Sequence, residues 1–264
     1  YTKYTSQLHP FNWRGWWDYG TGALGDMGCH ILDAPYKTLG LHYPTDVECS
    51  VGSVYQQAWS QNFIPEGCPP SSIVTLHFNK TDKNDSKIEL VWMDGGLRPS
   101  HPEDIPADDF LGEKNSTNGV LMIGEKGVIS CGVYALTPKL YRKGEKTIEF
   151  DTGGESSLDH IHHMEWINGI KAGYMSDTYK KITAPFEYAG PFTETVLMGN
   201  LAIRSYMSMG KEKPKYFEDK YHTSEFGKFV GRKKLLWDGD NMKITNFDEA
   251  NKFVGRVRRP GWNF

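Results

Sequence analysis

The sequence predicts an α+β fold in which helices cover one face of an open, mostly antiparallel sheet. Three observations predict this class. A stretch with helical spacing of apolar residues comes early in the chain, several short strand candidates follow it, and helical stretches return in the second half. No strand candidate is followed by a GxGxxG sequence, so we expect the dinucleotide-binding Rossmann domain to be absent from this sequence.

The first helix is expected from about Ala23 to Leu39, because apolar residues recur there at helical spacing before Gly40. Strands are expected in the segments that are rich in β-branched and aromatic residues, which are 46–59, 72–79 and 87–93. Proline, aspartate and glycine are dense in 95–118, which predicts a long surface loop.

The second half begins with a predicted hairpin, 119–123 and 127–131, joined by a tight turn. Shorter strands are expected near 139–141 and 146–150. One helix is expected from a cap at Ser157 to Gly173, and another from about Phe192 to Met209 before Gly210. A strand at 234–237 and a helix at 248–254 complete the prediction.

Composition limits the partners of the chain. Its 264 residues include 30 basic and 33 acidic side chains, a formal net charge of -3, so we expect no binding of nucleic acid. No run of about 20 apolar residues predicts a membrane span. The four cysteines lack CxxC spacing and are expected to be free, mostly buried thiols. The N-terminus has no initiator methionine and no signal-peptide pattern, and we interpret it as a cut edge.

The segment from Gly22 to Asp33 carries the clearest chemistry. Asp26, His30 and Asp33 are spaced i, i+4 and i+7, so they share one face if the segment is one helix. A carboxylate beside an imidazole can orient it and raise its basicity, as proton transfer requires. Two alternatives stay open at this point. Asp26 can simply favour the helix dipole while His30 packs, or the pair can ligate a metal, for which the rest of the chain offers no clear partner.

An aromatic segment precedes that helix and offers sugar-binding side chains. Trp13, Arg14, Trp16 and Trp17 can stack on a sugar face and donate to its hydroxyls, and Trp13 and Arg14 are the preferred ligands. The alternative is that two of these tryptophans pack in the core.

Three further groups have weaker functional interpretations. His163, beside His162, can point into the same cleft, although a surface pair is the common outcome. Glu165 and Trp166 are expected to cap and pack, while Arg98 and His101 can form a lid or remain solvated.

The stretch from Pro10 to Leu39, with Gly22, Asp26, Gly28, His30 and Asp33 in place, resembles the start of the C-terminal domain of the glucose-fructose oxidoreductase, inositol dehydrogenase and MocA family. The resemblance continues through 162–166, 188–204 and 246–252 with 261–262, and so covers most of the chain. These segments resemble a bacterial branch of the family.

This resemblance implies a fold like the C-terminal domain of glyceraldehyde-3-phosphate dehydrogenase, with 1–264 as a single substrate-binding and oligomerisation domain. It implies a preceding Rossmann domain, missing from this sequence, that binds NAD or NADP. The substrate is then a sugar, cyclitol or glycoside oxidised or reduced at a secondary hydroxyl. By resemblance His30 transfers the hydroxyl proton and Asp26 orients the sugar or the histidine. From the residues themselves we expect Trp13, Arg14, Asp33 and His163 to bind substrate, and we expect no metal.

The family also has a catalytic lysine in a Glu-Lys-Pro motif. The only Glu-Lys-Pro here lies at 212–214, away from the expected place, so this chain alone is expected to be inactive and to hold no cofactor. The family implies a homo-oligomer through the exposed sheet face, and a bacterial periplasmic location is favoured over the cytoplasm. Two other functions remain open: a glycosidase that oxidises its substrate transiently with NAD, and a non-catalytic carbohydrate-binding or assembly protein.

Overall fold

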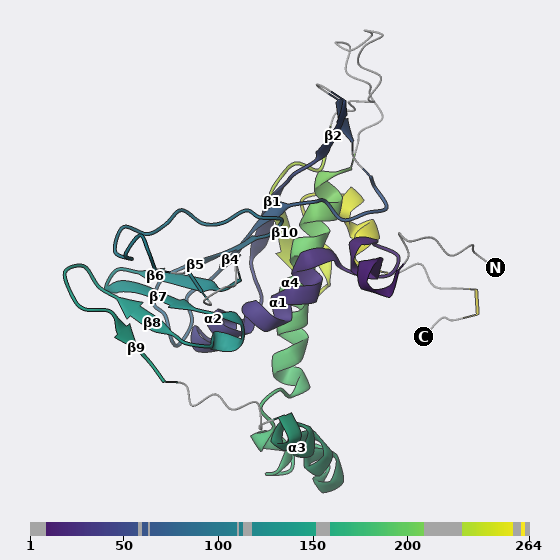
Figure 1. The fold of residues 1–264 in the computed structure, drawn as a ribbon. Coiled ribbons are helices and arrows are strands. Elements are labelled where there is room, and N and C mark those ends of the chain that lie inside the picture. The colour runs from purple at the N-terminus through teal and green to yellow at the C-terminus, as the bar shows by residue number, and fades with distance from the viewer. Residues whose placement is uncertain are drawn as a thin grey trace. The chain divides into compact units, whose positions relative to one another are not determined.

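The computed structural model describes residues 9–57, 60–62, 64–109, 111–112, 118–151, 159–208, 229–255 and 260–261. The chain forms two compact units that alternate along the sequence, and Figure 1 labels their elements. Unit 1 consists of Tyr1–Cys29, Leu39–Pro99 and Thr195–Phe264, and unit 2 consists of His30–Thr38 and Ser100–Glu194. That 1–264 acts as a single domain stays a prediction.

Unit 1 is built on a five-stranded antiparallel sheet. Its order is β11-β10-β1-β4-β5. The strands are β1 (Asp46–Val51), β4 (Ser72–Phe78), β5 (Ile88–Met93), β10 (Leu235–Asp238) and β11 (Lys243–Ile244). A separate hairpin pairs β2 (Val54–Gln57) with β3 (Ser60–Asn62), and short 3-10 helices lie at η2 (Pro10–Gly15) and η6 (Asp248–Phe253).

The two faces of this sheet differ in burial. Along β4 the residues alternate, so that Val74, Leu76 and Phe78 are buried while the side chains between them are half-buried. Two helices cover the apolar face, α1 (Gly22–Ile31) and the unit 1 part of α4 (Phe186–Tyr206). Helices and open antiparallel sheets together confirm the predicted α+β class.

Unit 2 contains a four-stranded antiparallel sheet in the order β6-β7-β8-β9. The strands are β6 (Val120–Gly124), β7 (Gly127–Cys131), β8 (Lys139–Tyr141) and β9 (Ile148–Glu149). Ile105, Val128 and Tyr141 form its small core. Its helices are α2 (Asp33–Thr38), η3 (Val133–Ala135), α3 (Asp159–Ala172), η5 (Tyr179–Lys181) and the first part of α4.

The single helix predicted from Ala23 to Leu39 is wrong, because a turn at Leu32 separates α1 from α2. Pro35 explains the break. It has no N–H to donate to the Ile31 carbonyl, and its ring would clash with that carbonyl in a continuous helix. Gly40 follows α2 with φ +62°, the left-handed conformation typical of a helix stop.

Other boundaries also differ from the prediction. The strand expected over 46–59 is interrupted after Val51, and α4 begins at Phe186 and continues through Pro191. The segment expected as a helix at 248–254 is the 3-10 helix η6. The predicted cap at Ser157 and the stop at Gly210 lie outside the described residues.

Candidate active site

Helix α1 begins where only glycine fits. Gly22 has φ +68°, and a Cβ added there would lie 3.0 Å from the Cys68 sulfur. The Thr21 carbonyl accepts the Gly25 N–H at 3.1 Å, which closes the first turn. The glycine-rich start of the segment therefore fixes where the helix begins.

Two further glycines let α1 approach α4 within unit 1. A Cβ at Gly28 would lie 3.2 Å from Val196 Cγ1, and one at Gly25 would lie 3.3 Å from Asn200 Nδ2. Any larger side chain would push the two helices apart. Spacing of three residues places both glycines on the side of α1 that meets α4.

Asp26 forms an ion pair with Arg14, through Arg14 Nη1 and Asp26 Oδ2. Both side chains are accessible, at 42% for Arg14 and 31% for Asp26. The pair joins the aromatic segment to α1 and presents donors and an acceptor to solvent. A solvated ion pair of this kind contributes about 0–1 kcal/mol to stability. Stabilisation of the fold alone therefore does not explain why Arg14 and Asp26 are paired.

Arg14 is positioned by residues 10–17, which contain η2 and are called the η2 strap. Its Nε donates to the Phe11 carbonyl at 3.2 Å, and its guanidinium lies 4.4 Å from the centre of the Phe11 ring. The strap is tied to the rest of unit 1 because the Cys68 N–H donates to the Gly15 carbonyl at 2.8 Å and the Trp17 N–H donates to the Glu66 carbonyl at 3.0 Å.

The tryptophans of the segment divide between exposed and packed positions. Trp13 is 46% exposed, and its ring lies 6.4 Å from that of Tyr19. Trp17 is half-buried and stacks under Arg204, whose guanidinium carbon is 5.3 Å from the ring centre. Trp13 is thus available to a ligand, whereas Trp17 takes the packing role that was the alternative.

His30 lies on α1 four positions after Asp26, as the sequence predicts. Its ring is half-buried and meets the Tyr134 ring edge-on, with centroids 5.2 Å apart. Asp26 contacts Arg14 and His30 contacts Tyr134, so each of the two has a neighbour that the sequence did not predict. Tyr134 itself holds a left-handed φ of 59°, which is costly for a non-glycine residue.

Asp33 begins α2 instead of continuing the face of α1. It accepts a hydrogen bond from the Tyr188 hydroxyl, a contact within unit 2. Burial and this carboxylate together raise the pKa of Tyr188, so the phenol stays protonated and donates. Asp33 is therefore engaged with protein in this structure.

His163 and the loop residues have surface positions. His163 is exposed on α3, with its ring 6.2 Å from that of His162. Thr183 accompanies that pair, with its hydroxyl 3.3 Å from His162 Nδ1. His101 bonds to the Ile105 carbonyl at 3.0 Å, which anchors it in its own loop.

Sequence reasoning missed Tyr134 and Tyr188, because each meets its partner across more than a hundred positions of sequence. The one signal for Tyr188 is that it opens the stretch 188–204 that resembles the family. No spacing rule points to Tyr134.

Two kinds of feature are absent from the described residues. No three His, Cys, Asp or Glu side chains there are grouped so as to hold a metal ion. In the same residues, no helix combines the length and the apolar character needed to cross a membrane.

Comparison with known proteins connects this site to a family. Residues 1–61 match the model of the oxidoreductase family, C-terminal alpha/beta domain, of the glucose-fructose oxidoreductase, inositol dehydrogenase and MocA group. Comparison with curated proteins gives no match. The matched segment contains the η2 strap, α1 and α2, and hence Arg14, Asp26 and His30. The family resemblance is thus confirmed over residues 1–61, which are similar to the C-terminal α/β domain of this oxidoreductase family.

Proposed function

We propose that this chain is the substrate-binding C-terminal domain of an NAD(P)-dependent oxidoreductase that acts on a secondary hydroxyl of a sugar, cyclitol or glycoside. The observation that carries the proposal is that the matched segment contains α1 with Asp26 and His30, next to an accessible tryptophan and an accessible ion pair.

His30 is the group that moves the proton. Oxidation of a secondary alcohol to a ketone removes the hydroxyl proton and the hydrogen on the same carbon, the latter as hydride. An imidazole accepts or returns the hydroxyl proton near neutral pH, which a carboxylate or an ammonium does less well. The ring suits this role because it is only half-buried and its contact with Tyr134 restricts its orientation.

The role of Asp26 and Arg14 is to bind the substrate, and Asp26 does not act by orienting His30. Their ion pair offers a carboxylate oxygen as acceptor and guanidinium N–H groups as donors, a combination that matches adjacent hydroxyls of a sugar ring. Trp13 offers an exposed aromatic face for the C–H side of that ring. Asp33 and His163, both in unit 2, remain proposed substrate ligands.

The described residues do not fit a dinucleotide. Every strand pairing among them is antiparallel, whereas a Rossmann cradle needs parallel strands with a glycine-rich turn. NAD or NADP would accept or supply the hydride, held by residues outside this sequence. On this proposal the chain alone does not turn over.

The open face of the unit 1 sheet is the proposed oligomer interface. Val91 on β5 and Leu236 on β10 are exposed on it, and burying them against a second copy would remove apolar surface from water. A periplasmic location also stays a proposal.

The test is hydride transfer by a full-length protein that contains this chain. It is supplied with NAD or NADP and a panel of sugars, cyclitols and glycosides. His30→Ala should lower kcat by about 100-fold or more, as loss of a general base does. Arg14→Ala should mainly raise KM. Cys29→Ser, an exposed neighbour on the same helix, is the matched control and should leave both unchanged.

Three outcomes would contradict the proposal in different ways. Equal activity of His30→Ala and Cys29→Ser would remove the histidine from the chemistry. Release of an aglycone without net consumption of NAD would replace the oxidoreductase with a glycosidase. Absence of turnover, together with sugar binding that survives His30→Ala, would indicate a binding protein.

A further inference from the structure

Asn200 on α4 is a buried amide without a hydrogen-bond partner. Only 6% of the residue is exposed, and among the described residues neither Oδ1 nor Nδ2 has a partner. Leaving a buried polar group unsatisfied is costly, and folded proteins almost always avoid it. An internal water molecule is the usual partner of such a group.

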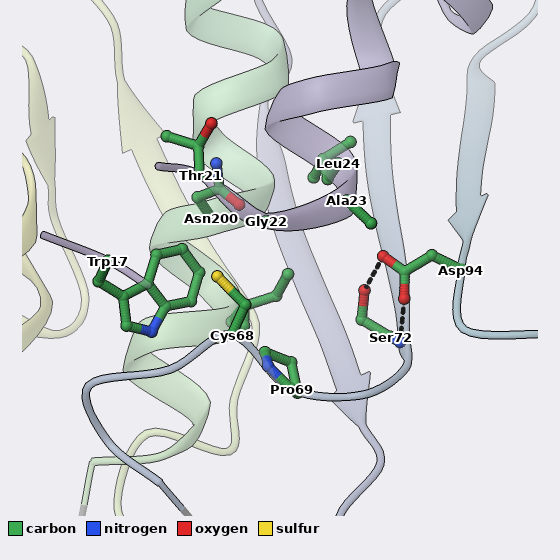
Figure 2. Close-up of a pocket in the computed structure, with 11 residues that line it drawn as sticks. Trp17, Thr21, Gly22, Ala23, Leu24, Cys68, Pro69, Ser72, Asp94 and Asn200 are labelled. Carbon is green, nitrogen blue, oxygen red and sulfur yellow. Dashed lines mark hydrogen bonds between the residues drawn. The ribbon is translucent and has the colours of Figure 1, made fainter. Parts of the chain in front are cut away.

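The Asn200 side chain lines a small cavity inside unit 1, shown in Figure 2. Its volume is about 10 Å³, and its wall includes Thr21, Leu24, Cys68, Ser72 and Asp94. A volume of about 10–15 Å³ on this measure is the space of a single water molecule.

A second polar group lies within reach of the same water. Thr21 Oγ1 and Asn200 Nδ2 lie 1.8 Å and 3.3 Å from one point, where a Cβ added to Gly25 would stand. The two atoms are therefore no more than about 5 Å apart, and one water at ordinary hydrogen-bond lengths can bridge them. Thr21 precedes α1 and Asn200 belongs to α4, so the bridge would join these two helices.

The rest of the wall favours neutral water over a cation. The Asp94 carboxylate already accepts from Ser72 N at 2.5 Å, Ser72 Oγ at 2.8 Å and Trp92 Nε1 at 2.8 Å. Burial raises the pKa of the Cys68 thiol to about 12, so Cys68 adds no negative charge to the wall at neutral pH.

We propose that unit 1 contains a specific binding site for one water molecule, held by Asn200 and Thr21, which links α4 to the first turn of α1. The orphaned Asn200 amide, the one-water volume and the nearby Thr21 hydroxyl carry this inference. It goes beyond the proposed function and does not depend on the oxidoreductase activity.

Oxygen-17 magnetic relaxation dispersion on the full chain tests the proposal, because it counts water molecules with long residence times. Asn200→Leu replaces the amide with an apolar group of similar size and should lower the count by about one relative to the unmodified chain. Thr21→Val should shorten the residence time of that water. Thr195→Val is the matched control, since its hydroxyl on the same helix already bonds to the His42 carbonyl at 3.3 Å.

An unchanged count in Asn200→Leu, or an equal loss in Thr195→Val, would overturn the proposal. If Asn200→Leu does not fold, a high-resolution crystal structure of the unmodified chain decides the question. A density peak at hydrogen-bond distance from both Asn200 and Thr21 supports the water site, and an amide bonded directly to protein with no peak refutes it.

Discussion

Replacing Gly199 with alanine is expected to destabilise the protein, although the same change inside a helix usually stabilises it by about 1 kcal/mol. Gly199 lies inside α4, where an added Cβ would stand 2.2 Å from Leu24 Cδ2 and 3.2 Å from Val74 Cγ1. Leu24 is only 1% exposed, and its other methyl group already lies against Gly28. Overpacking of this kind costs about 1–3 kcal/mol, and the helix gain of about 1 kcal/mol offsets part of it, so we expect a net loss of up to about 2 kcal/mol.

Urea denaturation of the two variants Gly199→Ala and Gly190→Ala measures this effect. Gly190 is on the same helix, and its added Cβ would meet only the exposed Phe186 ring at 3.4 Å. Gly190→Ala should therefore raise the free energy of unfolding by up to about 1 kcal/mol, so that the two variants differ in sign.

A double variant identifies the atom responsible. In a Leu24→Ala background the clash disappears, and Gly199→Ala should no longer destabilise the chain. Stabilisation by Gly199→Ala in the otherwise unmodified protein would refute the close packing of α1 on α4, and with it the explanation given for the glycines of α1.

Three other predictions concern single groups. At pH 8 iodoacetamide should label exposed Cys29 first. Burial raises the pKa of Cys68 to about 12, which leaves about 1000-fold less Cys68 thiolate than its ordinary pKa of 9.0 would. Fast labelling that survives Cys29→Ser would contradict this. Burial raises the pKa of Asp46, but hydrogen bonds outweigh it and hold the pKa below 3.8. The Asp46 carboxylate therefore stabilises the fold above pH 3.8, and this stabilisation is lost as the pH falls through the pKa of the folded state. Asp46→Asn should flatten the acid side of a plot of unfolding free energy against pH, and identical acid sides in the two proteins would exclude the effect. Asp109→Ala removes the carboxylate that accepts a hydrogen bond from the buried Tyr141 hydroxyl at 2.9 Å, so it should lower the free energy of unfolding by about 1–3 kcal/mol. An unchanged midpoint of urea denaturation would disprove this.

The sequence predicted most of the fold because hydrophobic periodicity and turn residues are local signals. Strands β4, β5 and β7 lie where alternation and glycine place them. The errors arise where one residue overrides periodicity. Pro35 ends a helix that the apolar pattern would continue, whereas Pro191 is accommodated inside one.

The candidate site was predictable in its residue types but not in its contacts. The spacing of Asp26 and His30 identified the helix that carries them. Partners such as Arg14 for Asp26 and Tyr134 for His30 depend on how separate segments fold together, which spacing does not encode. The orphaned Asn200 amide is likewise invisible in sequence, since a buried asparagine and a solvated one look alike.

The order of segments in unit 1 has a consequence for how the chain folds during synthesis. Asp46 on β1 pairs with Leu236 on β10, and the larger segment of unit 2, Ser100–Glu194, lies between them in sequence. Contacts so distant along the chain close slowly and late, because the entropy of a long loop must be overcome before they form. The edge of β1 that pairs with β10 must then stay unpaired until β10 has left the ribosome. Unit 2 is synthesised in one continuous stretch apart from α2, so it can fold earlier.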